Sequence, residues 1–93
     1  MPEQNVRLVN RLGLHARAAA QVVRVSKEFE SEIVLKRQDT NLEANAKSIL
    51  GLLSLSASHG IDLVLTAEGP DASQALLAIS RLFEQGFGEE QIG

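Results

Sequence analysis

The sequence predicts a two-layer α+β domain in which four strands carry helices on one face. Three observations support this class. The chain has 93 residues, which suits one compact domain spanning residues 1–93. Hydrophobic residues make up 44% of it and charged residues 23%, as in globular proteins. Its apolar residues recur with the period of a strand or of a helix, and the segments follow in the order β-α-β-β-α-β-α.

The first strand and the first helix are predicted from their apolar spacing. Asn5–Val9 alternates with period 2, which places Val6 and Leu8 on one face of a strand. After a loop at Asn10–Gly13, the segment from Ala16 to about Glu28 has helical spacing. Its expected apolar face consists of Ala16, Ala19, Ala20 and Val23.

The middle of the chain predicts a hairpin. Glu32–Arg37 (EIVLKR) has the composition of a strand, and Gln38–Asn41 contains residues that favour turns. Leu42–Asn45 then predicts a short third strand, with Leu42 and Ala44 on the same face.

Two helices and a strand are predicted for the remainder. Ser48–Leu55 is assigned as a helix with Ser48 as its N-cap, and Ile61–Thr66 as a strand. Asp71 and Gln74 have the spacing of a capping box at the start of the last helix. Its buried stripe is expected to comprise Ala72 or Ala75, Leu76, Ile79, Leu82 and Phe83, and Gly86 and Gly88 to end it before a frayed acidic tail, Glu89–Gly93.

Composition and charge exclude several functional classes. The absence of cysteine excludes disulfides and thiolate chemistry, and no long apolar segment or basic leader is found, so we expect a cytoplasmic protein. A net charge of −3 argues against a dedicated nucleic-acid binder. Residues 1–27 nevertheless carry five cations against one acid, whereas residues 28–93 carry four against eleven. The basic segment should attract a phosphate or an acidic partner.

That basic segment contains the most distinctive stretch, Leu12–Ala20 (LGLHARAAA). A glycine turn places His15 at the start of a helix, with Arg17 two residues later. Imidazole is nucleophilic near neutral pH, and first-turn amides such as that of Ala16 have no intrahelical acceptor. A phosphoryl group on His15 would meet these amides and the Arg17 cation together. We therefore predict that an exposed His15 accepts a phosphoryl group and passes it on, although an isolated histidine here could be a plain N-cap.

These motifs resemble the HPr family, the histidine-containing phosphocarriers of the bacterial phosphoenolpyruvate-dependent phosphotransferase system. The similarity lies in Asn10–Ala20 (NRLGLHARAAA), Ala46–Leu55 (AKSILGLLSL) and Ala67–Gly69 before the last helix. It implies an open-faced β-sandwich, with a four-stranded antiparallel sheet covered on one face by three helices. It also implies phosphorylation of His15 on Nδ1 by the system's first enzyme and delivery to a sugar permease component or a regulatory relay. The protein would then be a monomeric carrier that needs no cofactor, not a stand-alone enzyme.

By the same resemblance, Ser48 is the regulatory serine that an HPr kinase/phosphorylase modifies. Ile49, Leu50 and Leu53 would form an exposed apolar patch for partners. From the residues alone, Ser48 could be an N-cap only and the three apolar residues could be core, as Leu52 and Leu55 are expected to be. The chain departs from the family in Ala18, where proline is usual, and in a hairpin about two residues longer.

Three alternatives remain open from the sequence. A nitrogen-regulatory branch of the system would use the same His15 chemistry without a sugar. A regulatory binding module would depend on phosphorylated Ser48 and would not need His15. A small ligand-binding domain would need a glycine-rich loop or polar pocket, and neither is found. With two histidines far apart and no cysteine, we expect no metal site.

Overall fold

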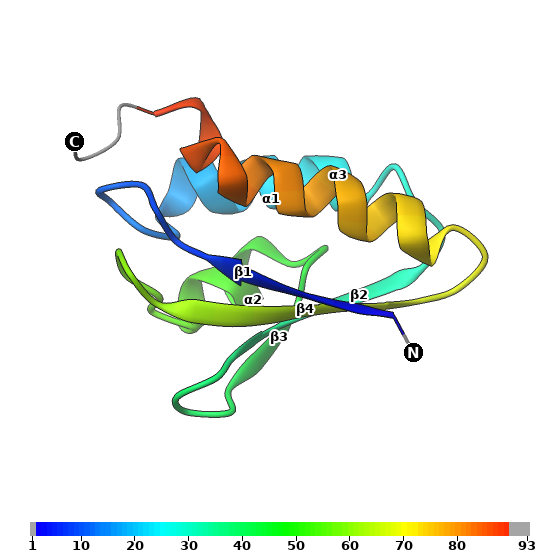
Figure 1. The fold of residues 1–93 in the computed structure, drawn as a ribbon, viewed down its shortest axis with the longest axis horizontal. Coiled ribbons are helices and arrows are strands. Elements are labelled where there is room, and N and C mark those ends of the chain that lie inside the picture. The colour runs from blue at the N-terminus through cyan, green and yellow to red at the C-terminus, as the bar shows by residue number, and fades with distance from the viewer. Residues whose placement is uncertain (1, 90–93) are drawn as a thin grey trace.

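The computed structural model describes residues 2–89 and contains a four-stranded antiparallel sheet (Figure 1). The strands are β1 (Glu3–Arg7), β2 (Glu32–Arg37), β3 (Glu43–Asn45) and β4 (Asp62–Glu68), in the spatial order β1-β4-β2-β3. Every neighbouring pair is antiparallel. The predicted fold class is therefore confirmed.

Within residues 2–89, three α-helices and a short 3-10 helix accompany the sheet. They are α1 (Ala16–Ser26), α2 (Ile49–Ser54), α3 (Ala72–Glu84) and η1 (Gly86–Gly88). Figure 1 shows α1 and α3 side by side on one face of the sheet. The shorter α2 packs against α1 and β3. No helix in the described part of the chain has both the length and the apolar character that a membrane crossing requires.

The core lies between the helices and one face of the sheet. Strand side chains alternate, so every second residue of β2 and β4 is buried while its neighbours stay partly accessible. The buried strand residues are Val6, Ile33, Leu35, Ala44, Leu63, Leu65 and Ala67. The opposite face has no covering layer in the described residues, which an antiparallel sheet tolerates.

The predicted β2 is correct at both ends, whereas the other strands shift. β1 begins at Glu3, which pairs with Thr66, and ends at Arg7, which pairs with Asp62, whereas β4 continues to Glu68. β3 begins at Glu43 and not at Leu42. Leu42 is 53% exposed while Ala44 is buried, so the expectation that they share a face is wrong. Leu42 follows the turn in which Asn41 has a φ of 62°, before the β3 ladder starts.

The buried face of α1 differs from the predicted one, because the helix is rotated about its axis. Its buried residues are Ala18, Ala19, Val22 and Ser26, whereas Ala16 and Ala20 are exposed and Val23 is half-buried. Three consecutive alanines, Ala18–Ala20, match more than one helical stripe, so periodicity alone could not fix the rotation. The helix also ends at Ser26, earlier than expected, and this rotation leaves Arg17 exposed.

The capping box predicted for α3 is also wrong. Asp71 stands at the N-cap position but makes no side-chain cap hydrogen bond. Its carboxylate instead accepts hydrogen bonds from the Ser31 hydroxyl at 2.6 Å and from the amides of Glu30 and Ser31, each at 3.0 Å. The Ser31 hydroxyl, followed by the Glu30 amide, holds the pKa of Asp71 below its ordinary value. The residues of the predicted apolar stripe of α3 are buried, except Leu82, which is half-buried.

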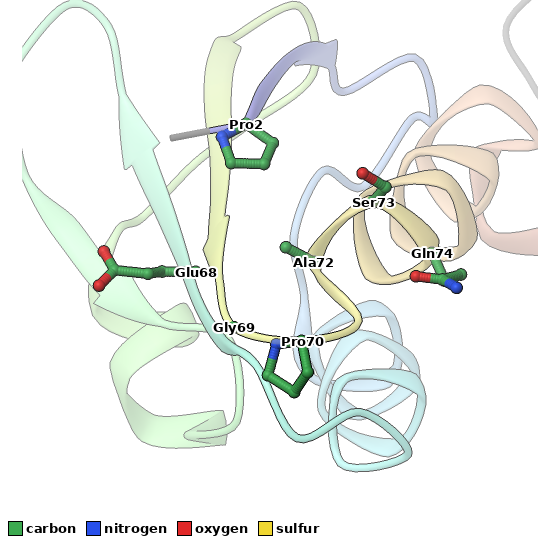
Figure 2. Close-up of a pocket in the computed structure, with 7 residues that line it drawn as sticks. All are labelled: Pro2, Glu68, Gly69, Pro70, Ala72, Ser73 and Gln74. Atoms are coloured by element: carbon green, nitrogen blue, oxygen red, sulfur yellow. The ribbon is translucent and has the colours of Figure 1, made fainter.

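A pocket lies at the N-terminal end of α3 (Figure 2). It has a volume of about 410 Å³ and is lined by Pro2, Glu68, Gly69, Pro70, Ala72, Ser73 and Gln74. None of the predicted functional residues lines it. The residues that carry the predicted chemistry must therefore be sought elsewhere.

Candidate functional site

A tightly held loop presents His15. Gly13 has a φ of 66°, and a Cβ there would lie 2.6 Å from the Ala57 carbonyl oxygen. The Leu14 amide donates to that same carbonyl at 2.9 Å. Only glycine suits both the left-handed conformation and the close backbone approach. The glycine turn thus fixes where the chain enters α1.

His15 is the N-cap of α1, at the start of the helix where the sequence analysis places it. Its backbone is extended, with φ −79° and ψ 179°, and its carbonyl accepts from the Ala19 amide at 2.8 Å. The ring nitrogen Nδ1 accepts from the Arg17 amide at 3.2 Å. The Ala16 amide has no acceptor within residues 2–89. His15, Ala16 and Arg17 therefore gather at the positive end of the helix dipole.

Two residues that sequence reasoning missed complete this site. Asn10 is fully buried, and its Nδ2 donates to the Gly13 carbonyl at 2.8 Å and to Glu89 Oε1 at 2.9 Å. The other carboxylate oxygen of Glu89 contacts Nε2 of His15. The His15 side chain is consequently only 23% exposed and that of Glu89 12%. His15 is expected to be exposed but is half-buried, because Glu89 covers one edge of its ring.

Glu89 reaches His15 through a reversal after α3. Gly86, Phe87 and Gly88 have φ values of 60°, 59° and 75°, so three successive left-handed residues turn the chain back. Phe87 is a strained position for a non-glycine residue, but its ring is buried edge-on against Phe83, with centroids 5.0 Å apart. Figure 1 shows this end of α3 lying over the start of α1.

The C-terminal segment is also tied directly to α1. Gln21 Nε2 donates to the Phe87 carbonyl at 3.1 Å. The expectation of a frayed tail is therefore wrong for Glu89, while residues 90–93 lie outside the described part. The signal in the sequence was the Gly-Phe-Gly triplet, in which a large apolar residue between two glycines indicates a packed turn.

The environment of Glu89 favours its ionised form. Burial would raise its pKa, but the hydrogen bonds from Asn10 and His15, and the charges of His15 and Arg17, outweigh burial and hold the pKa below its ordinary value. A carboxylate at neutral pH can only accept hydrogen bonds. The Asn10 Oδ1 atom is buried without a partner among the described residues, so its amide is oriented by its two donated bonds.

The second predicted position, Ser48, is the N-cap of α2. Its Oγ accepts from the Gly51 amide at 3.1 Å, and its backbone is extended. The side chain is half-buried. Arg37 holds the other end of the helix, where its Nη1 donates to the Leu55 carbonyl at 2.9 Å. The N-cap prediction for Ser48 is confirmed.

The apolar residues of α2 divide between core and surface. Leu52 and Leu55 are buried, as expected. Ile49 and Leu50 are exposed, Leu50 by 77%, whereas Leu53 is half-buried against the core. Leu12, in the loop before His15, is also 64% exposed, and the predicted apolar patch did not include it. No cluster of three or more His, Asp or Glu side chains within residues 2–89 is arranged to hold a metal ion.

Known proteins provide an independent comparison. The family described as "PTS HPr component phosphorylation site" matches residues 2–85. The phosphocarrier protein HPr of Treponema pallidum is 48% identical over 90 residues, covering 97% of this chain and 100% of that protein. The phosphocarrier protein NPr of Escherichia coli K12 is 38% identical over 88 residues, covering 95% and 97%.

Solved structures give the same result. HPr-C-His from Thermoanaerobacter tengcongensis superposes with a TM-score of 0.90 at 42% identity, covering 97% of this chain and 99% of that one. An HPr dimer from the same bacterium has a TM-score of 0.75 at 42% identity, with coverage of 96% and 100%. The fold, the near-complete coverage and the sequence identity agree. The chain belongs to the HPr family of phosphocarrier proteins of the phosphotransferase system.

Proposed function

We propose that His15 is the residue on which this phosphocarrier holds its phosphoryl group, through Nδ1. One observation carries the assignment: Nδ1 points toward the first-turn amides of α1 and accepts a hydrogen bond from the Arg17 amide at 3.2 Å. A phosphoryl group on Nδ1 would enter the positive end of the helix dipole. Nε2 instead faces a carboxylate, where a phosphoryl group would be repelled.

Arg17 and Ala16 would bind the transferred group. The Arg17 amide can change its acceptor from Nδ1 to a phosphoryl oxygen, and the Ala16 amide offers a second donor. The Arg17 side chain is exposed, so its guanidinium can follow the phosphoryl group during transfer. Catalysis would consist of positioning and charge neutralisation. The protein would act as a carrier and need no cofactor.

The partners follow from the family's role in the phosphotransferase system. We propose that the first enzyme donates the phosphoryl group and that a permease component or a regulatory relay accepts it. Ile49, Leu50 and Leu53 of α2 would be the docking patch, since the first two are exposed apolar residues on a helix that packs against α1. A cytoplasmic monomer of one domain, residues 1–93, would meet both partners in turn, and sedimentation would test the oligomeric state.

Ser48 would be the regulatory position. Phosphorylation there adds a charge of about −2 directly before the exposed Ile49 and Leu50. The helix N-terminus would tolerate this charge, but docking of an acidic partner would suffer from repulsion and desolvation. An HPr kinase/phosphorylase acting on Ser48 would therefore reduce transfer without touching His15.

The nitrogen-regulatory branch is a second candidate. It is favoured by the 38% identity to NPr over 88 residues. Its donor would be the first enzyme of that branch, with the same chemistry at His15. Faster phosphorylation by that enzyme than by its sugar-branch counterpart would support it, and the reverse order would exclude it.

The deciding experiment measures intact mass after incubation with phosphoenolpyruvate and a first enzyme, before and after mild acid. We expect one added phosphate that acid removes, as phosphohistidine requires, and none in His15→Ala. His59→Ala is the matched control, because His59 is an exposed histidine outside the site, and it should behave as wild type. An acid-stable phosphate, or phosphorylated His15→Ala, would contradict the assignment.

A further inference from the structure

We infer that Glu89 is a positioning residue for His15, which holds the proton on Nε2 and keeps Nδ1 free and turned toward the N-terminus of α1. The inference rests on the proposed role of His15 as phosphoryl acceptor. It concerns a residue 74 positions away along the chain, outside the phosphorylation motif.

The hydrogen bonds around the ring specify which nitrogen carries the proton. A carboxylate accepts but does not donate, so Nε2 must supply the hydrogen between His15 and Glu89. On the other side of the ring, the Arg17 amide is a donor, so Nδ1 must be the acceptor. The two contacts select the same tautomer from opposite edges. The Nδ1 lone pair is therefore the one available for attack.

The chain holds Glu89 in place through several independent contacts. The fully buried Asn10 donates to its second oxygen at 2.9 Å and at the same time to the Gly13 carbonyl at 2.8 Å. One amide thus links the carboxylate to the turn that presents His15. The preceding Phe87 is buried and bound through its carbonyl to Gln21 of α1. The carboxylate position is set before any partner arrives.

The geometry matters most during transfer. As the bond from Nδ1 to phosphorus forms, the bond from phosphorus to the donor atom breaks, and its electron pair stays with the donor. The proton remains on Nε2, so the ring of His15 becomes cationic. The Glu89 carboxylate already faces that edge and stabilises the charge as it develops. On onward transfer the ring returns to its neutral form with the same proton in place.

The test combines transfer rates with NMR of the imidazole ring. In Glu89→Ala we expect phosphoryl acceptance from the first enzyme to slow about tenfold. Glu89→Gln keeps an acceptor oxygen without the charge, so its rate of phosphoryl acceptance should lie between those of Glu89→Ala and the wild type. Glu84→Ala is the matched control, since Glu84 is an exposed acidic residue at the end of α3, and it should leave the rate unchanged.

The ring itself reports the positioning. The Nε2 proton of His15 should give a slowly exchanging, downfield signal in the wild type that disappears in Glu89→Ala, while circular dichroism shows a folded protein.

The outcomes separate the two hypotheses. If His15→Ala still accepts phosphate, the assignment of His15 fails. If His15→Ala is inert but Glu89→Ala keeps the wild-type rate and ring signal, the role of Glu89 alone fails. A faster Glu89→Ala would also overturn the inference, since the carboxylate would then be a competitor of the incoming phosphoryl group.

Discussion

The N-termini of α1 and α2 are built alike and differ in chemistry. In each helix the N-cap side chain accepts a hydrogen bond from a first-turn amide. His15 Nδ1 accepts from the Arg17 amide at 3.2 Å, and Ser48 Oγ accepts from the Gly51 amide at 3.1 Å. At α1 the cap has a second partner, Glu89, on the far edge of the ring. The same backbone feature therefore carries an imidazole ring contacted at both nitrogens in one helix and a simple hydroxyl cap in the other.

Under the proposed function, the comparison teaches how one kind of helix N-terminus would serve two purposes. A phosphoryl group on imidazole nitrogen leaves readily because the ring can become cationic, so the α1 end suits a relay. A phosphate on the Ser48 hydroxyl is an ester and a poor donor, so the α2 end suits a lasting signal. The neighbours fit these roles: α1 has the exposed cation Arg17, whereas α2 begins with the exposed apolar Ile49 and Leu50.

Reversing the charge beside His15 should have the largest effect short of removing the ring. We expect Arg17→Glu to slow phosphoryl acceptance about 100-fold, because a carboxylate replaces the cation that faces the incoming group. Stopped-flow or quench measurements with the first enzyme would show it. Arg24→Glu is the control, since Arg24 is an exposed cation two turns further along α1. An equal loss in both variants would mean that the net charge of α1, not the site, controls the rate.

Placing a charge at the α2 end tests the docking role. Ser48→Asp should weaken binding to the first enzyme about tenfold, or about 1.4 kcal/mol, through repulsion beside Ile49 and Leu50. Titration calorimetry measures this affinity. Ser73→Asp adds the same charge in the first turn of α3, at the pocket of Figure 2, and should bind as the wild type does. Unchanged affinity of Ser48→Asp would leave the serine as a cap only.

Removing the Ser48 hydroxyl separates capping from regulation. Ser48→Ala should lower the free energy of unfolding by about 1 kcal/mol, because the Gly51 amide loses its acceptor, and should leave the transfer rate unchanged. Urea denaturation followed by circular dichroism provides the stability. Slower transfer in this variant would make Ser48 part of the transfer site, and the contrast between the two helix ends would disappear.

The sequence predicted the two helix ends better than their surroundings. Local chemistry specifies an N-cap, so Ser48 and His15 were placed correctly, and β2 was bounded by its own composition. The buried face of α1 was predicted wrongly because consecutive alanines do not show which side of a helix faces the core. Asp71 was misassigned because Ser31, 40 residues earlier in the chain, competes for its carboxylate.

The largest omission was Glu89, and it has the same cause. Contacts across 74 residues depend on how α3 ends, and no local pattern reports where a chain returns after a turn. The Gly-Phe-Gly turn indicates that the chain reverses but not what it then meets. Long-range polar contacts are thus the part of this site that the fold, and not the motif, supplies.

Acid should weaken the α1 end in a way that the α2 end does not share. The pKa of Glu89 lies below its ordinary value of 4.5 in the folded protein, so its contacts stabilise the fold fully above that value and are lost as the pH falls through the lowered pKa. The free energy of unfolding of the wild type should exceed that of Glu89→Gln by about 1 kcal/mol at neutral pH, and the difference should shrink as the pH falls through the lowered pKa of Glu89. The difference between wild type and Ser48→Ala should stay constant over the same range, since a serine cap does not titrate. Urea denaturation at several pH values measures both differences. If the difference in the free energy of unfolding between wild type and Glu89→Gln stayed constant with pH, the shape of the Glu89 side chain and not its charge would hold it against His15. The two helix ends would then differ only in the side chain that each presents.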